Sequence, residues 1–180
     1  MDYSERQGHG LKYENLVIQR YNINKDKNYT DEWDGLLGDT PVSIKCIKKG
    51  AEIDLASFKR NAMKTSDFYL IVGFWEDKKD NIVEEHVLLI NGKEWHQLFP
   101  LHFIDDFDEM LNNITNDRSD DAKWKKMISE QRKQWKLETD NLIRPRFKRD
   151  HKTQKRIQCA ISNQDFYSYF LPKYEVADVR

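Results

Sequence analysis

A carboxylate, a hydroxyl and an ammonium group are spaced in this sequence so that they can share one face of a β-hairpin. Asp34 lies in a short strand expected at residues 33–37, and Ser43 and Lys45 lie two residues apart in a second strand expected at residues 42–47. Residues two apart in a strand point to the same side, so these groups oppose the apolar face of the hairpin. Polar groups on a half-buried hairpin need partners, and a metal ion with its water would supply them.

The turn between the two strands determines which residues face each other. Residues 38–41, Gly-Asp-Thr-Pro, carry the turn-forming side chains. If residues 39–40 form a two-residue loop, Asp34 faces Lys45 across the hairpin. Two interpretations follow: the two residues form an ion pair on a solvated face, or they belong to a catalytic site.

A helix is expected at residues 11–21, after a polar segment at residues 1–10 that we expect to be a loosely held arm. Glu14 lies close to the apolar stripe of this helix, where a carboxylate needs a partner. Glu14 therefore belongs either to the same site as Asp34 or to an exposed first turn, where the helix dipole favours an acidic side chain.

Hydrophobic periodicity and turn residues predict the remaining elements. They are an amphipathic helix at 52–64, a buried strand at 67–75, a strand at 83–90, a short helix at 93–99, an acidic helical segment or lid at 101–116, a helix at 123–137, a basic loop broken by proline at 144–149, a strand at 155–161 and a short aromatic element at 165–171. The order predicts an α/β core with a mixed β-sheet flanked by helices.

The overall composition is typical of a soluble folded protein. Hydrophobic residues make up 38% of the 180-residue chain and charged residues 34%, and the net charge is −1. Cys46 and Cys159 lie in apolar strand-like segments, which indicates buried thiols in a reducing compartment. The first ten residues are polar and no apolar segment reaches the length of a membrane span. We therefore expect a cytoplasmic protein without a membrane partner.

Positive charge is concentrated in the last third of the chain. Residues 123–156 contain 13 Lys and Arg against four acids, a difference of +9 in an otherwise acidic sequence. Basic residues interleaved with Trp, Phe and His are typical of a protein that binds a polyanion. The alternative is a solvated basic helix that packs against the acidic residues 105–109.

The order of these polar residues resembles that of the PD-(D/E)XK nuclease superfamily, and within it the type II restriction endonucleases. Glu14 precedes Asp34, and Ser43-Ile44-Lys45 follows on the second hairpin strand. The superfamily core is a helix, a three-stranded meander, a helix and a further strand, and the resemblance covers about residues 8–92. It implies a restriction-endonuclease-like core at 1–116 and a mostly helical, basic extension at 117–180 for DNA recognition or dimerisation, which can also pack on the core as one domain.

The resemblance departs from the superfamily pattern at one position. The second acid, two residues before the lysine, is Ser43 here. Some restriction endonucleases of the superfamily also have a serine there, and the following helix supplies their carboxylate. Glu52 and Asp54 open that helix in this chain, but they lie closer to Lys45 than such a relocation implies. Glu14 is therefore the favoured source of the second carboxylate, with Glu52 and Asp54 as alternatives.

The resemblance implies a role for each residue of the site. Mg²⁺ binds oxygen ligands and needs only one or two protein carboxylates. Asp34 would be the main ligand, Glu14 a direct or water-mediated ligand, and the backbone carbonyl of Ile44 a third. Lys45 would orient the attacking water and the scissile phosphate, and Ser43 would hydrogen-bond a metal-bound water.

The resemblance also implies double-stranded DNA as the partner and a homodimer that cuts both strands of a short palindrome, as part of a restriction–modification system. Basic and amide side chains would contact phosphates and base edges. The candidates are Gln19, Lys133, Arg144, Arg146, Lys148, Arg149, Gln154, Arg156 and Gln158. No glycine-rich nucleotide-binding loop and no zinc-ligand spacing are present, so we expect no nucleotide cofactor.

Three other functions fit the same residues. A structure-specific or repair nuclease, such as a junction resolvase, would read the shape of DNA rather than its sequence. A non-catalytic DNA-binding protein would have Ser43 as the mark of a degenerate active site. A protein-interaction module would use the basic region to bind an acidic partner, and salt-sensitive DNA binding would argue against it.

Overall fold

The computed structural model of the chain describes residues 3–25, 33–76, 81–114, 119–149 and 155–177, with the backbone alone for residues 3–9. The chain divides into two compact units. Unit 1 comprises Met1–Ile53, Ser66–Lys93 and Asn163–Arg180, and unit 2 comprises Asp54–Thr65 and Glu94–Ser162. This division differs from the predicted boundary at residue 116, because the last part of the chain returns to unit 1. Within the described ranges, no helix combines the length and apolar character of a membrane span.

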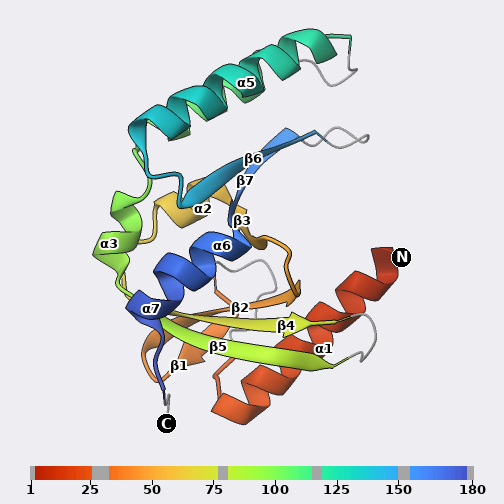
Figure 1. The fold of residues 1–180 in the computed structure, drawn as a ribbon, viewed down its shortest axis with the longest axis vertical. Coiled ribbons are helices and arrows are strands. Elements are labelled where there is room, and N and C mark those ends of the chain that lie inside the picture. Colours follow the sequence, from red (N-terminus) through yellow and green to blue (C-terminus); the bar gives the residue numbers. More distant parts are fainter. Residues whose placement is uncertain (1–2, 26–32, 77–80, 115–118, 150–154, 178–180) are drawn as a thin grey trace. The chain divides into compact units, whose positions relative to one another are not determined.

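A four-stranded mixed sheet forms the centre of unit 1 (Figure 1). In spatial order its strands are β1 (Gly35–Leu37), β2 (Thr40–Lys48), β4 (Phe68–Trp75) and β5 (Ile82–Ile90). β2 and β4 run parallel, and the two outer pairs are antiparallel. The prediction of an α/β chain with a mixed sheet is confirmed, and β4 is buried almost throughout, as its continuous apolar sequence indicates.

Helix α1 (Tyr3–Tyr21) covers one face of this sheet. Tyr13 and Val17 pack against Val42 and Ile44 of β2 in the core. The ring of Tyr13 lies so close to Gly73 that a Cβ atom there would be 2.3 Å from the Tyr13 Cζ atom. The absence of a side chain at position 73 therefore allows α1 to approach the sheet.

The helix begins earlier than the sequence predicts. The prediction of a loose arm over residues 1–10 is wrong from Tyr3 onward, because the backbone is already helical there. Gly8 and Gly10 lie inside the helix instead of marking its start. A glycine inside a helix costs about 1 kcal/mol relative to alanine, which weakens a helix without ending it.

A second helical segment covers the other face of the unit 1 sheet. It consists of α6 (Asn163–Asp165), a π-helical turn η1 (Phe166–Phe170) and α7 (Leu171–Tyr174). The Phe74 ring contacts the rings of Phe166 and Tyr167 at centroid distances of 5.7 and 5.9 Å. The sheet of unit 1 is therefore covered by helices on both faces (Figure 1).

The β1–β2 hairpin forms, but its register differs from the prediction. Leu37 pairs with Thr40 and Gly35 with Val42, so residues 38 and 39 form the loop instead of 39 and 40. Gly38 adopts a φ of 59°, in the left-handed region that glycine occupies without steric cost. The shift amounts to two residues, so the paired side chains of β1 and β2 keep their predicted faces. Asp34 precedes β1 and is not paired with Lys45; its N–H donates to the Val42 carbonyl.

Among the described residues, unit 2 contains a three-stranded sheet and four helices. The strand order is β3 (Ile53–Ser57), β7 (Lys155–Ile161) and β6 (Ile143–Arg149). The helices are α2 (Phe58–Ala62), α3 (Gly92–Gln97), α4 (His102–Asn112) and α5 (Asp121–Glu138). β3 and α3 each begin in the last residues of unit 1. The predictions for the helices at 93–99 and 123–137 and for the strand at 155–161 are confirmed. The segment predicted at 101–116 as a helix or a lid is helical over His102–Asn112, and its residues 115–116 lie outside the described ranges.

Aromatic side chains fill the core of unit 2. The Phe58 ring meets Phe99, Phe107 and Trp135 edge-on, at centroid distances of 5.4, 4.9 and 5.4 Å. Trp135 donates its indole N–H to the Ile143 carbonyl at 2.7 Å, which ties α5 to β6. Aromatic pairs in this geometry add about 0.5–1.5 kcal/mol each beyond the burial of their surface.

Two predictions for unit 2 are wrong. The expected helix at 52–64 is strand β3 followed by the short helix α2, because Ile53 and Leu55 alternate with outward residues and β3 pairs with β7. The expected loop at 144–149 is strand β6. Pro145 is tolerated because β6 is an edge strand, where a missing N–H need not break a ladder hydrogen bond. The basic extension is consequently less helical than the sequence indicates.

Candidate active site

Asp34 is bound to the backbone of the strand that carries Ser43 and Lys45. Its N–H donates to the Val42 carbonyl at 2.9 Å, and its carboxylate Oδ2 accepts from the N–H of Ile44 at 2.6 Å. The carboxylate thus takes the place of a backbone carbonyl just before β1 begins. A charge-assisted hydrogen bond of this kind contributes about 1.5–3 kcal/mol and fixes the carboxylate against β2.

The backbone carbonyl of Ile44 lies on the same side of β2 as Asp34. In a strand, the N–H and C=O of one residue point to the same neighbour, and the N–H of Ile44 points to Asp34. The Asp34 carboxylate and the Ile44 carbonyl therefore face the same side of β2, at the open end of the hairpin. These are two oxygen ligands of the kind that the sequence predicted for a magnesium ion.

Ser43 and Lys45 share the face of the sheet opposite to α1. Val42 and Ile44, which alternate with them, pack into the core under α1. Ser43 is 6% exposed, whereas Lys45 is half-buried and forms no ion pair with any residue that the structure describes. The predicted face is confirmed, and the predicted Asp34–Lys45 pairing is replaced by the Asp34–Ile44 hydrogen bond.

Glu14 lies on α1 and therefore on the other side of the sheet from Ser43 and Lys45. Its Oε1 atom forms an ion pair with Lys25 at 3.0 Å. Within the described residues, no hydrogen bond joins Glu14 to Asp34. Glu14 is half-buried, so it is not in a solvated first turn. Its carboxylate is bound by Lys25, so it is not directed at the hairpin either.

The alternative carboxylates do not lie on a helix. Glu52 precedes β3, and Asp54 lies within β3 in unit 2. The Asp54 carboxylate accepts a hydrogen bond from the N–H of Ala56 at 2.9 Å and contacts the Lys148 ammonium at 3.4 Å. Both interactions bind Asp54 within unit 2, whereas the hairpin belongs to unit 1.

No group of three or more His, Cys, Asp or Glu side chains within the described ranges is arranged to hold a metal ion. Cys46 and Cys159 are free thiols, and burial raises the pKa of Cys46 to about 11, so Cys46 is not a ready thiolate ligand. The oxygen donors that the sequence predicted at the hairpin are the Asp34 carboxylate, the Ile44 carbonyl and the Ser43 hydroxyl. This hard-oxygen set fits Mg²⁺, which retains several waters, and does not fit zinc.

The predicted DNA-binding residues of β6 and β7 gather on one face of the ribbon that these strands form. Paired residues share a face, and the register pairs Arg146 with Gln158 and Lys148 with Arg156. We call this surface the polar ribbon face. Its members are Arg144, Arg146, Lys148, Arg156 and Gln158, all half-buried. The Oε1 atom of Gln158 is buried and has no hydrogen-bond partner among the described residues.

The other predicted DNA contacts lie elsewhere. Arg149 is on the opposite ribbon face, where its guanidinium binds Asp120 and Asp121, each at 2.8 Å, and is 5% exposed. Gln19 is exposed on α1 and Lys133 is exposed on α5. Gln154 lies outside the described residues. The structure therefore groups five of the nine predicted contacts and assigns Arg149 a structural ion pair.

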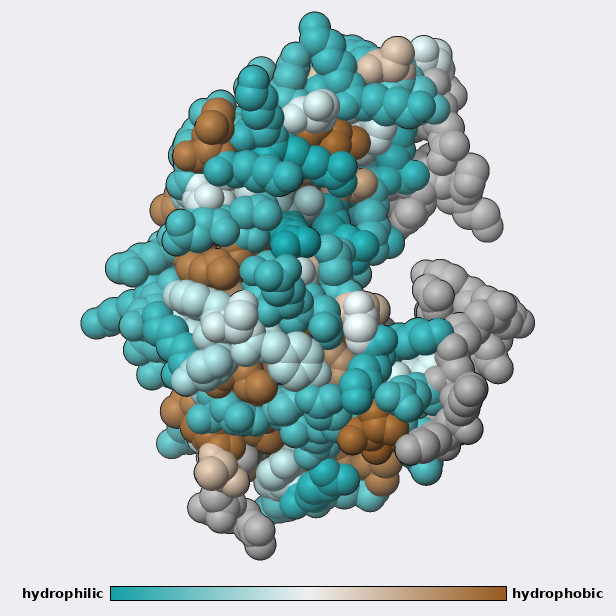
Figure 2. Space-filling view, in the orientation of Figure 1, coloured by the Kyte–Doolittle hydropathy of each residue, from teal (hydrophilic) through white to brown (hydrophobic). Residues whose placement is uncertain are grey.

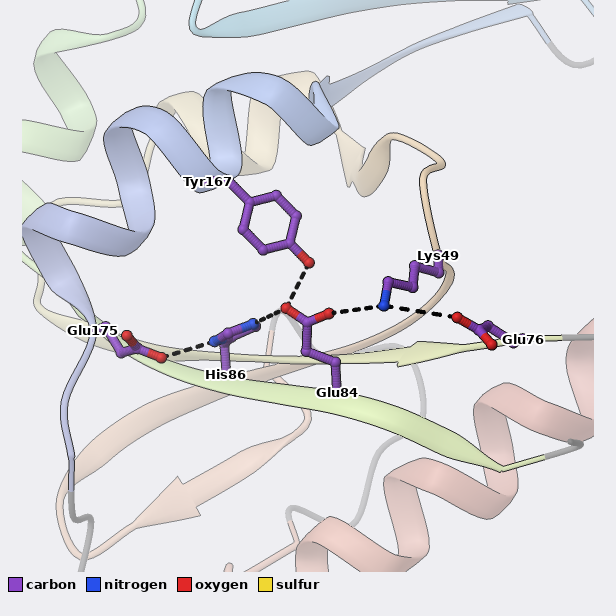
Figure 3. A network of polar contacts seen from close by, with 6 residues as sticks. All are labelled: Lys49, Glu76, Glu84, His86, Tyr167 and Glu175. Carbon is purple, nitrogen blue, oxygen red and sulfur yellow. Dashed lines mark hydrogen bonds and ion pairs between the residues drawn. The ribbon is translucent and has the colours of Figure 1, made fainter.

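A polar network on β5 was not predicted (Figure 3). His86 contacts Glu84 through Nε2 at 2.6 Å and Glu175 through Nδ1 at 2.7 Å. The Tyr167 hydroxyl donates to Glu84 at 2.7 Å, and the Lys49 ammonium lies 3.6 Å from the same carboxylate. Glu84 and His86 are two apart on one strand, which is the only signal in the sequence; their partners come from distant segments.

The network changes the pKa values of its members. Burial disfavours the charged form of His86, but the hydrogen bonds to Glu175 and Glu84 outweigh burial and raise its pKa. Burial also opposes the ionised form of Glu84, and the hydrogen bonds from His86 and Tyr167 outweigh it, so the pKa of Glu84 is lowered. A histidine between two carboxylates therefore links β5 to the segment that follows α7, and the raised pKa favours its charged form.

A second unpredicted cluster fastens α1 to β5. The Glu85 carboxylate accepts hydrogen bonds from the hydroxyls of Tyr13 and Tyr21 at 2.9 and 3.0 Å, and from Arg20 at 2.6 Å. Burial, with the nearby Glu85 charge, raises the pKa of Tyr13. Both tyrosines are therefore neutral donors, and the cluster stabilises the packing of α1 on the sheet.

Comparison with known proteins gives no relative: no protein-family model, no curated protein and no solved structure matches the chain.

Proposed function

We propose that this protein is a Mg²⁺-dependent endonuclease that hydrolyses phosphodiester bonds in double-stranded DNA. The observation that carries the proposal is the 2.6 Å hydrogen bond between the Asp34 carboxylate and the N–H of Ile44, the residue between Ser43 and Lys45. It joins the acid of the proposed site to the strand that holds the lysine. The acid, the peptide and the lysine are the parts that the resemblance to PD-(D/E)XK nucleases requires.

The order of elements in unit 1 supports a restriction-endonuclease-like core. Helix α1 is followed by Asn24, which forms an isolated antiparallel bridge with Leu36 of β1. Asn24, β1 and β2 together make a short three-stranded meander, and a crossover then leads to β4, which is parallel to β2. The departure is α2 in the crossover, which has five residues and belongs to unit 2.

The residues of the hairpin can be given roles in this reaction. Asp34 and the Ile44 carbonyl would hold Mg²⁺, which when bound would neutralise phosphate charge and make a bound water more acidic. The half-buried Lys45 ammonium would offset the negative charge that develops on the phosphate and orient the attacking water. The Ser43 hydroxyl, which is both a donor and an acceptor, would hold that water by a hydrogen bond.

The second carboxylate of the site is assigned to Glu14 in this proposal. Glu14 belongs to unit 1 with Asp34, whereas Asp54 is bound by Lys148 within unit 2. The ion pair of Glu14 with Lys25 joins two partly exposed side chains. Such a pair contributes about 0–1 kcal/mol, so Glu14 can leave Lys25 at little cost. Glu14 would then act from the α1 side of the sheet, opposite to Ser43 and Lys45.

A sequence-specific, type II restriction activity is the form of the proposal that the polar ribbon face supports. Arginine pairs with guanine edges and glutamine with adenine edges in the major groove. β6 and β7, which carry such residues, are two strands of the three-stranded sheet of unit 2. Arg146 and Gln158 are cross-strand neighbours on this face, and the buried Oε1 atom of Gln158 would have to become exposed to reach a base. A homodimer would read both halves of a palindrome with the same residues.

The test is incubation of the purified protein with plasmid and phage DNA, in Mg²⁺ and in EDTA. We expect discrete fragments in Mg²⁺ only, and their ends give the recognition site. Asp34→Asn and Lys45→Ala should abolish cleavage, whereas Lys48→Ala, an exposed lysine on the same strand, should retain it. Cleavage of branched DNA alone would indicate a structure-specific nuclease instead of a restriction endonuclease.

One observation favours a second candidate, a non-catalytic DNA-binding protein. Ser43 occupies the position of the superfamily's second acid, and Glu14 is engaged by Lys25. This candidate predicts DNA binding without cleavage in Mg²⁺ or Mn²⁺, and no effect of Lys45→Ala on binding. The same incubation therefore separates the two functions, because discrete fragments exclude the second one.

A further inference from the structure

Helix α5 has a stripe of positive charge that the proposed active site does not use. Its basic members are Lys125, Arg132, Lys133 and Lys136, which are all exposed. Together with Ile128 and Ser129 they line one surface hollow of unit 2. In Figure 2 the visible surface in the region of α5, at the top of the view, is mostly hydrophilic. We call these four side chains the α5 stripe.

The position of the stripe on the helix follows from its spacing. Lys125, Arg132 and Lys136 are seven and four residues apart, so they lie in a line along one side of the helix, with Lys133 beside it. Trp124 and Trp135 are buried and fix the inward side. The packing of α5 on its unit therefore keeps the three lysines of the stripe exposed, whereas the Arg132 guanidinium lies 5.7 Å from the centre of the Phe147 ring of β6.

The stripe is not neutralised by the acidic segment that could have covered it. Asp108 of that segment binds Lys59 at 2.8 Å, and Glu138 binds His102 at 2.9 Å. No member of the α5 stripe forms an ion pair within the part of the chain that the structure describes. These ion pairs do not support the alternative, in which the basic helix packs against the acidic residues 105–109.

The dimensions of the stripe match a chain of phosphates. From Lys125 to Lys136 the helix rises about 16 Å, at about 1.5 Å per residue. One strand of duplex DNA carries a phosphate about every 3.4 Å along its axis, so about five phosphates span this length. Protein-binding surfaces, by contrast, are depleted in lysine and enriched in aromatic side chains, and Ile128 is the one apolar residue lining the hollow.

We infer that the α5 stripe binds the phosphate backbone of duplex DNA without reading its sequence. The choice of DNA as the polyanion rests on the proposed function. Lysine acts as a point charge toward phosphate and does not distinguish bases, so the stripe would set affinity and orientation rather than specificity. The prediction is a strong dependence of binding on salt that originates in these side chains.

The experiment measures binding of a fluorescent 30-base-pair duplex of random sequence by anisotropy, in EDTA and at several salt concentrations. The test variant is Lys125→Gln/Lys133→Gln/Lys136→Gln. The matched control, Lys12→Gln/Lys93→Gln/Lys123→Gln, removes three exposed lysines outside the stripe. Thermal unfolding of both variants establishes that they fold, since these surface changes leave the buried face of α5 intact.

The expected result is a loss of at least about tenfold in affinity near 0.1 M salt for the test variant. The slope of log K against log salt should become shallower by about 2.7, or 0.9 for each lost phosphate contact. The control should bind within about twofold of the unchanged protein. Equal binding by all three proteins, or no binding of duplex DNA at all, would overturn the inference.

Cleavage assays on the same proteins separate this inference from the proposed function. If the unchanged protein cuts DNA and the stripe variant binds and cuts equally well, the stripe inference fails and the nuclease proposal stands. If no protein cuts DNA but the stripe variant alone loses binding, the inference stands and the nuclease proposal fails.

Discussion

The carboxylate of Asp34 and the backbone N–H of Ile44 are joined by a hydrogen bond of 2.6 Å across the open end of the β1–β2 hairpin. This bond has two consequences. It continues the hairpin ladder past β1, and it holds a negative charge beside the peptide between Ser43 and Lys45. A substitution that retains the acceptor and removes the charge can separate these two consequences.

Asp34→Asn and Asp34→Ala are therefore expected to differ in stability and agree in activity. The asparagine amide oxygen can still accept from Ile44, so Asp34→Asn should cost about 1 kcal/mol, whereas Asp34→Ala should cost about 2 kcal/mol or more. Both should lower Mg²⁺-dependent cleavage by about 10²-fold or more, because both remove the charge. Urea unfolding and single-turnover cleavage measure the two effects.

One result would contradict a catalytic role for Asp34. If Asp34→Asn cleaves DNA at the unchanged rate while Asp34→Ala only unfolds more easily, the carboxylate has a structural role alone. Lys45→Ala provides the comparison within the same strand, since it removes the cation and leaves the Asp34–Ile44 bond in place.

Elements whose pattern has one interpretation could be predicted from the sequence. The continuous apolar run of β4 and the turn residues at 38–41 predicted the central strand and the hairpin. The faces of Ser43 and Lys45 followed from the two-residue period of a strand, which survives the two-residue register shift. The pairing of Asp34 did not follow, because it depends on whether the loop is residues 38–39 or 39–40.

Other features depend on contacts between distant segments, which periodicity does not report. Residues 53–57 fit a helical and a strand pattern equally, and pairing of β3 with β7 decides between them. The link of His86 to Glu175 joins residues 89 positions apart. Pro145 indicated a loop because the sequence does not reveal that β6 is an edge strand.

Gly73→Ala tests the contact between α1 and the sheet. The new Cβ atom would lie 2.3 Å from the Tyr13 ring, which is buried and anchored by Glu85, so the ring cannot move freely. Overpacking of this kind costs about 1–3 kcal/mol. We expect a lower free energy of unfolding, measured in urea, with α1 displaced from β4.

Gly10→Ala is the matched control for Gly73→Ala. Gly10 lies within α1 and a Cβ atom there would have no neighbour within 4 Å. Alanine in a helix is favoured over glycine by about 0.5–1 kcal/mol, so this variant should be more stable than the unchanged protein. Equal stability of the two variants would contradict the close approach of Tyr13 to Gly73.

Arg149→Met tests whether this predicted DNA contact is structural. The guanidinium is 5% exposed and binds Asp120 and Asp121, each at 2.8 Å. Removal of the cation leaves both carboxylates without their partner. This should lower the free energy of unfolding by about 2–4 kcal/mol, a range that allows for the partial exposure of Asp121. The slope of DNA binding against salt should stay unchanged. Lys133→Met, on the exposed side of α5, should instead make the salt dependence of DNA binding weaker and leave the free energy of unfolding unchanged.

The His86 network predicts a dependence of stability on pH. The pKa of His86 is raised above its unfolded value of about 6.5, so its contribution is complete below pH 6.5 and is lost as pH rises through the folded pKa. The pKa of Glu84 is lowered, so its contribution is present above about pH 4.5 and is lost as pH falls through the folded value. Stability from this network is therefore greatest between about pH 4.5 and 6.5.

His86→Asn separates this network from every other titrating group. Asparagine has no proton to lose near neutrality, so the fall in melting temperature between pH 6 and 8 should be smaller in the variant than in the unchanged protein. Because Glu175 binds His86 and the next residue, Val176, donates its N–H to Val87 of β5 at 2.9 Å, the C-terminal segment should also become more sensitive to carboxypeptidase as pH rises. Parallel pH profiles for the two proteins would exclude His86 as the titrating group. An unchanged rate of digestion across the same range would mean that Val176, and not His86, holds the segment on β5.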